Sequence, residues 1–282
     1  MNIIFPTDFS EQSADAFEMA LYLAEKTNPE ILLLHVYSMP MVTTSIEDGG
    51  FDTMPDQLIR LSEEAATNRI AQFKDSLINR YNKGYGNRIP VTEVLRMGFV
   101  ADEIVALAEK EDVFCIVIPV VHTTGMDRLL FGGIVSSVLK KSNSPVFTVP
   151  KDFSFRQIQR LAYATDLTFA DNEVIDKLLF LADIFEAELK CFHVHDSNLE
   201  IENSIIQDFI TQYSNEVERK RISFQLIENL NVLDGMDYFV KENRIDLLGM
   251  LRQKSYMNSL FNISYTKKMS SHSEIPLIIY HE

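Results

Sequence analysis

The sequence lacks three features that would place it in a specialised class of protein. No window approaches the ~20 consecutive apolar residues of a membrane-spanning helix, and the first residues have neither a basic segment nor a long apolar stretch, so no secretory signal is expected. Basic residues form only pairs, such as Lys140-Lys141, and the formal net charge is −15. Because an acidic surface repels phosphate backbones, no nucleic-acid partner is expected.

Cysteine is also scarce. Cys115 and Cys191 both lie in strongly apolar, strand-like runs, where we expect small core residues rather than a disulfide framework. Together these absences favour a cytoplasmic protein without a membrane partner. The 282 residues, of which 46% are apolar, suffice for two domains with sizeable cores.

What the sequence does contain is an internal repeat. Thr7-Asp8 returns as Thr165-Asp166, and His35-Val36 returns as His193-Val194, each 158 residues later. A period of this length is far too long for a solenoid, and it indicates an α/β unit of roughly 140 residues present in two copies. The predicted domains are residues 1–150 and 160–282, joined by a short charged linker.

In each copy, apolar runs alternate with segments of helical periodicity, which predicts a doubly wound α/β fold around a parallel sheet. The predicted strands are 3–5, 31–36, 91–95, 113–118 and 145–149 in the first copy, and 161–164, 189–194, 222–227, 245–251 and 276–280 in the second. The predicted helices are 14–24, 56–81, 102–110, 132–141, 172–185, 232–242 and 260–271.

Two local features of the first copy complete this prediction. Asp8 and Glu11 have the spacing of a capping box, so Asp8 is expected to cap the first helix. Residues 38–55 have only a short counterpart in the second copy, and a loop of this length is either a lid or disordered.

The repeated motifs resemble the universal stress protein family in its tandem form. The resemblance is carried by Pro6-Thr7-Asp8-Phe9-Ser10, His35-Val36 and Gly132-Gly133-Ile134-Val135, and in the second copy by Thr165-Asp166, His193-Val194 and Thr266-Lys267-Lys268-Met269. It implies two doubly wound domains of the adenine nucleotide alpha hydrolase-like fold, each with a five-stranded parallel sheet. It also implies that the last strands, 146–149 and 277–280, pair within the chain as a pseudo-dimer, while a homodimer of whole chains stays open.

Many members of this family bind ATP through Gly-x-x-Gly, nine residues and Gly-Ser/Thr after the fourth strand, because glycine lets the backbone approach phosphate closely. Counting back from Gly132-Gly133 puts Pro119 and His122 at the first two motif glycines. Pro119 has no N–H to donate, and His122 adds bulk where close approach is needed.

The family also places the aspartate after the first strand by the ribose, and the residue that ends the second strand by the adenine. Asp8, Val36, Gly132 and Gly133 therefore form a residual nucleotide site, with ATP as the only candidate cofactor. Asp166 and Val194 persist in the second copy, but no glycine follows Gly249. Either aspartate serves equally well as a helix cap.

A metal site and an enzyme active site are both disfavoured. Cys191, His193 and His195 share one face of a strand but span about 13 Å at ~3.3 Å per residue, too far for one ion without ligands from another element. His35 has no such company, which favours a structural role for His193. No nucleophile elbow, pair of catalytic carboxylates or P-loop lysine is present.

The leading hypothesis is therefore a non-enzymatic protein of the stress response that binds a protein or a small molecule. The alternative is an ATP-binding switch or weak ATPase that uses the residual site of the first copy.

Overall fold

The computed structural model describes residues 1–38, 54–85, 88–120, 133–151, 153, 155–168, 171–195, 203–252 and 274–282. The described chain separates into two compact units, Met1–Val117 and Ile118–Glu282. Most of the predicted lid or disordered segment, and the predicted helix 260–271, lie outside the described residues.

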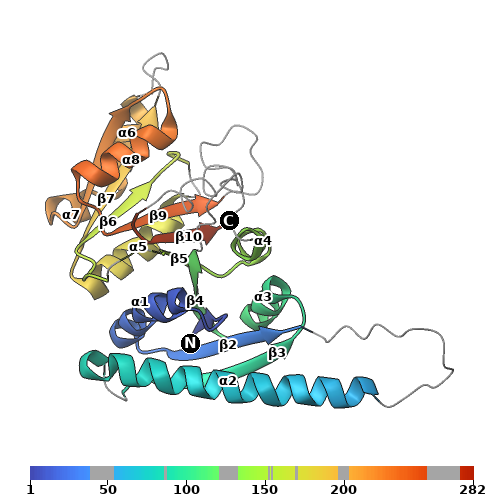
Figure 1. The fold of residues 1–282 in the computed structure, drawn as a ribbon. Helices are drawn as coiled ribbons and strands as arrows, with labels where there is room; N and C mark the ends of the chain where they lie inside the picture. Colours follow the sequence, from blue (N-terminus) through green and yellow to red (C-terminus); the bar gives the residue numbers. More distant parts are fainter. Residues whose placement is uncertain are drawn as a thin grey trace, which may run out of the picture. The chain divides into compact units, whose positions relative to one another are not determined.

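The first unit is built on parallel strands in the order β3-β2-β1-β4, with α2 as its longest helix (Figure 1). The strands are β1 (Asn2–Pro6), β2 (Glu30–Tyr37), β3 (Val91–Met97) and β4 (Val113–Val120), and the helices are α1 (Glu11–Thr27), α2 (Met54–Tyr85) and α3 (Val100–Lys110). The apolar run of β2 is buried from Ile31 to Leu34, as expected for a strand covered on both faces.

The strands of the second unit lie in the order β5-β10-β9-β6-β7-β8. Its strands are β5 (Val146–Pro150), β6 (Arg160–Ala164), β7 (Glu188–His195), β8 (Ile222–Glu228), β9 (Leu247–Arg252) and β10 (Leu277–His281). Its helices are α4 (Gly133–Lys141), α5 (Asp171–Phe185), α6 (Asn203–Gln212), α7 (Ser214–Glu218) and α8 (Val232–Glu242). The strands from β10 to β8 pair in parallel.

The pairing of β5 with β10 is antiparallel, with Ile278 opposite Phe147, and it confirms the predicted association of the two last strands. Because of this pairing, β5 belongs to the second compact unit. The domain boundaries at 150 and 160 were predicted from the sequence repeat and stay a prediction, whereas the compact units are defined by contacts between residues.

The carboxyl end of α4 is bound to the ends of β9 and β10. The guanidinium of Arg252 donates to the carbonyl of Leu139, and Nε2 of His281 lies 3.0 Å from that oxygen. Arg252 is only 6% exposed. This strand-end arginine is therefore buried rather than solvated, because a helix carbonyl without an intrahelical partner takes up its donor.

The two copies share backbone detail as well as order. Asn2 lies opposite Glu30 in the β1–β2 ladder, and Arg160 lies opposite Glu188 in the β6–β7 ladder, 158 residues later. The left-handed residues recur too: φ is 66° at Phe9 and 59° at Leu167, and it is 61° at Asn28 and 55° at Glu186. The repeat therefore preserves strand register and turn conformation.

The structure confirms that the two cysteines are core residues without a disulfide. Cys115 in β4 and Cys191 in β7 are both fully buried and unpaired with each other. Among the helices that the structure describes, none combines the length and apolar content that a membrane crossing requires.

Candidate functional site

The two Thr-Asp motifs form matching turns at the carboxyl ends of β1 and β6. Oγ1 of Thr7 accepts a hydrogen bond of 3.0 Å from the N–H of Phe9, and Oγ1 of Thr165 accepts one of 2.9 Å from the N–H of Leu167. In open α/β sheets, ligands bind outside the carboxyl ends of the strands. These turns are therefore the first place to look for a functional site.

Asp8 is held by the helix that follows it. Its Oδ1 accepts from the N–H of Ser10 at 3.0 Å and from the hydroxyl of Ser13 at 2.9 Å. Partial burial raises the pKa of Asp8, but the hydrogen bonds from Ser10 and Ser13 outweigh it and leave the pKa below its ordinary value.

The predicted capping box of Asp8 and Glu11 is wrong. The N-cap of α1 is Ser10, whose side chain accepts from the N–H of Ser13. The left-handed conformation of Phe9 turns the chain before the helix begins, so the residue directly before Glu11 takes the capping position.

The two repeated histidines fasten these turns. Nδ1 of His35 lies 2.9 Å from the carbonyl of Thr7, and Nδ1 of His193 lies 2.7 Å from the carbonyl of Thr165. A carbonyl only accepts, so Nδ1 carries the proton in both rings. Burial lowers the pKa of both histidines. The matching contacts support the predicted structural role, and the described ranges contain no group of three His, Cys, Asp or Glu side chains placed to hold a metal.

The predicted residual nucleotide residues fall in different parts of the structure. Asp8 and Val36 belong to the first unit, and Gly133 is the first residue of α4 in the second unit. Gly132 and His122 lie outside the described residues. A Cβ atom built on Gly133 meets nothing within 4 Å, so packing does not require glycine there.

In the second copy, the strand-end residue Val194 is covered. Val194 is 2% exposed, and a Cβ atom built on Gly235 of α8 would lie 2.6 Å from its Cγ1. Helix α8 therefore packs directly against the position that the family places beside the adenine.

The second unit contains a cavity of about 290 Å³ beside the Thr165 turn, between α5 and α6. Its lining combines polar and apolar residues, and consists of Thr165, Leu167, Thr168, Asp171, Asn172, Ile175, Asp208, Phe209 and Gln212. Sequence reasoning missed this site. The available signal was the replacement of Ser13 and Ala14 by Asp171 and Asn172 at the repeat distance.

Asp171 is the more buried of the two carboxylates in this lining, with an exposed fraction of 3%. It accepts from the hydroxyl of Tyr163, from the N–H of Thr168 at 2.7 Å and from the hydroxyl of Thr168 at 3.0 Å. Burial, strengthened by the charge of Asp171, raises the pKa of Tyr163 well above its ordinary value. The equivalent residues of the first copy, Phe5 and Ser13, cannot form this pair.

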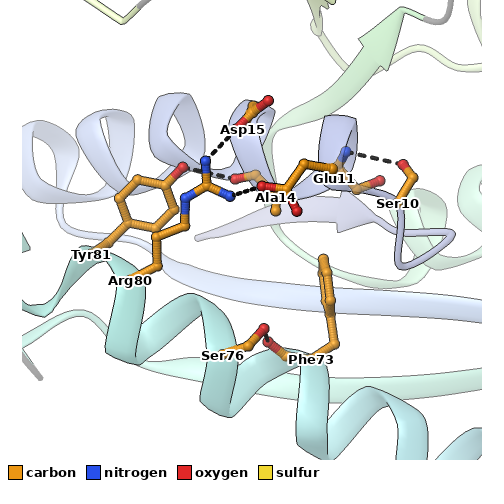
Figure 2. Close-up of polar contacts among 9 residues, drawn as sticks. Ser10, Glu11, Ala14, Asp15, Phe73, Ser76, Arg80 and Tyr81 are labelled. Carbon is orange, nitrogen blue, oxygen red and sulfur yellow. Dashed lines mark hydrogen bonds and ion pairs between the residues drawn. The ribbon is translucent and has the colours of Figure 1, made fainter.

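In the first unit, side chains of α2 reach across to the matching helix α1 (Figure 2). Arg80 of α2 reaches α1, where its guanidinium lies 2.5 Å from Oε1 of Glu11 and 2.5 Å from Oδ1 of Asp15. The hydroxyl of Tyr81 donates to the carbonyl of Ala14 at 2.9 Å, and burial raises the pKa of Tyr81 to about 12.

The universal stress protein family model matches residues 1–150, slightly more than half of the chain. The chain belongs to the universal stress protein family. Two family members of Methanocaldococcus jannaschii are similar to it: MJ0531 is 28% identical over 149 residues, and MJ0577 is 25% identical over 161 residues. Each alignment covers 53% of this chain, and they cover 81% and 94% of the two relatives.

A solved structure extends the likeness to the whole of this universal stress protein. The crystal structure of a universal stress protein from Archaeoglobus fulgidus matches with a TM-score of 0.69 and 18% identity, covering 100% of this chain and 96% of the other. At this identity the match shows the fold alone, and it includes both copies of the repeat.

Proposed function

We propose that this universal stress protein acts in the stress response as a non-enzymatic binding protein whose ATP-binding motif has decayed in both copies. The observation that carries the proposal is Pro119, which occupies the first motif glycine at the end of β4. Proline supplies no N–H to a phosphate and has no glycine-like freedom. His122 replaces the second motif glycine.

The surroundings of the repeated aspartate, Asp8, support the same proposal. One carboxylate oxygen of Asp8 already accepts two hydrogen bonds from the start of α1, so a structural role accounts for its presence. In the second copy, Val194 is covered by α8, and the sequence after Gly249 contains no glycine.

The proposed lack of catalysis rests on the groups that most often perform it. Burial raises the pKa of the thiols of Cys115 and Cys191, which makes them poor nucleophiles. The Nδ1–H groups of His35 and His193 are already engaged in hydrogen bonds to the carbonyls of Thr7 and Thr165. The net charge of −15 supports a partner other than nucleic acid, and the expected cytoplasmic location remains part of the proposal.

The alternative, an ATP-binding switch or weak ATPase, is favoured by one observation. Gly133 is the first residue of α4, and a Cβ atom built on it meets nothing within 4 Å, so the packing of described residues does not explain the glycine. A helix start with exposed N–H groups also suits an anion.

Equilibrium dialysis of the full chain against labelled ATP with Mg²⁺ tests the two functions. We expect no saturable binding below about 1 mM, which is the weak end of specific association. Submillimolar binding that Gly133→Val abolishes would favour the switch. The matched control is Gly84→Val in α2, where a Cβ atom also meets nothing within 4 Å.

A further inference from the structure

Strand β8 is the last strand of the second unit, and one of its edges is open. It pairs with β7 along its whole length, and no described residue pairs with its other edge. The carbonyl of Arg221 and the N–H of Asn229 both bond to β7. Because the backbone groups of successive strand residues point to alternate sides, the groups that point away from β7 belong to Ile222, Phe224, Leu226 and Glu228. These donors and acceptors are available to another strand.

The matching edge strand of the first copy, β3, carries charges that β8 lacks. The first residues of β3 and β8 are counterparts, because each pairs with the same position of the repeat. Glu93 and Arg96 of β3 therefore correspond to Phe224 and Ile227 of β8. Charged side chains are one means by which edge strands avoid pairing with other chains. From Ile222 to Ile227, β8 contains no charged residue, proline or glycine, so nothing in its sequence opposes such pairing.

The sequence of β8 is complementary to itself in the antiparallel direction. A twofold axis through Gln225, the middle residue of the strand, pairs Phe224 with Leu226 of the second copy. The same axis pairs Ile222 with Glu228. All the backbone groups that point outward then find partners. Phe224 and Leu226 are only half-buried within one chain, and in this pairing their side chains cover each other.

The charges at the two ends of β8 fit the same arrangement. Arg219 and Lys220 are exposed before the strand begins, and Glu228 is exposed where it ends. Antiparallel pairing brings the basic end of one strand beside the acidic end of the other, and it puts no like charges directly opposite each other within the strands. The second copy of this chain is therefore a partner with complementary charge.

We propose that two copies of this chain associate through antiparallel pairing of their β8 strands. The chain uses the same geometry internally, where β5 pairs with β10. This inference goes beyond the proposed binding function, because it makes the chain its own partner. A single pair of strands forms a small interface, so we expect a reversible dimer with a dissociation constant of about 10–100 µM.

Sedimentation equilibrium of the full chain over a concentration series tests the proposal. Salt at about 0.15 M screens the repulsion between two chains of net charge −15. Gln225→Lys places two ammonium groups opposite each other at the axis and should weaken the dimer several-fold. Asn68→Lys, the same change of charge on an exposed residue of α2, is the matched control and should leave the dimer unchanged.

A cross-link tests the register of the two strands. At the axis Gln225 lies opposite itself in a non-hydrogen-bonded pair, where Cα atoms are about 4.5 Å apart, a distance that a disulfide can span. Gln225→Cys should therefore give a covalent dimer on mild oxidation. Ser223→Cys should not, because its two copies lie four residues out of register. The native cysteines are fully buried and do not compete.

Three outcomes would overturn the proposal: a full chain that stays monomeric at about 500 µM, well above the expected constant, a dimer that Gln225→Lys leaves unchanged, or equal cross-linking through both cysteine variants. Ser223 and Gln225 are exposed, so thermal melting should show that their variants fold as the wild type does. A monomeric chain would leave the ATP dialysis unaffected, so this proposal and the proposed function fail separately.

Discussion

At the scale of single residues, the second copy carries a buried polar pair that the first copy does without. Tyr163 and Asp171 are almost fully buried and hydrogen-bonded, whereas the equivalent residues are Phe5 and Ser13. Removing one member leaves a buried acceptor with fewer donors, while exchanging both recreates a combination that the fold already tolerates.

Tyr163→Phe is therefore expected to lower the free energy of unfolding by about 1–3 kcal/mol. Adding Asp171→Ser should recover part of this loss, so the two changes are less damaging together than their sum. Urea unfolding of both single variants and the double variant measures the coupling. Strictly additive losses would show that the pair is not a unit.

His193 is expected to make stability depend on pH. Burial lowers its folded pKa below the ordinary value of 6.5, so the unfolded chain binds the proton more readily. Its contribution is fully present above the unfolded pKa and is lost as pH falls from about 6.5 towards the lowered folded pKa.

His193→Asn keeps a donor for the Thr165 carbonyl but removes the titration. We expect the wild-type chain to lose more unfolding free energy than this variant between about pH 7.5 and pH 5.5. Chemical denaturation at the two pH values measures the difference. An equal loss in both proteins would contradict the assignment.

At the scale of elements, the order of strands and helices in the described residues could largely be predicted from the sequence. Apolar runs such as 31–36 and 113–118 became buried strands, because a strand covered on both faces needs an apolar residue at every position. The second-copy helix α8 begins and ends as predicted, at Val232 and Glu242.

Two helices, one helix cap and the cavity were not predicted correctly, each for a physical reason. Helices α6 and α7 were not predicted, although Ile206, Phe209, Ile210 and Tyr213 recur at helical spacing. This apolar pattern covers only two turns, and α7 has just five residues, none of them buried. The N-cap of α1 was misplaced because the left-handed turn at Phe9 cannot be recognised from spacing alone. The cavity depends on side-chain volumes at residues far apart in sequence, which periodicity does not report.

The antiparallel joint between β5 and β10 gives a prediction at this scale. Thr148 and Leu277 lie opposite each other, so cysteines at both positions should form a disulfide on mild oxidation. Cysteines at Val146 and Leu277, two residues out of register, should react far less. Intact-mass analysis of the oxidised variants detects the bond. Equal yields from both pairs would contradict the register.

At the scale of the whole molecule, the tandem arrangement supplies a partner for a strand that would otherwise be exposed. Every residue of β5 is buried, and β10 covers one of its edges. An uncovered edge strand of this kind pairs readily with another chain.

A fragment of residues 1–150 is therefore expected to self-associate through β5. Sedimentation equilibrium should show a dimer, and Thr148→Pro, which removes a backbone donor, should shift the fragment towards monomer. The full chain, measured beside it, provides the reference in which β5 already has β10. A monomeric fragment that retains its fold would contradict the prediction.

The complete burial of Cys115 and Cys191 determines how their thiols react with oxidants. The thiolate is the form that attacks peroxide, and burial raises the pKa of both thiols so far that hardly any thiolate forms near neutral pH. The chain has no other cysteine. We therefore expect both cysteines to stay reduced in the presence of peroxide, so any response of this protein to an oxidant does not pass through its thiols.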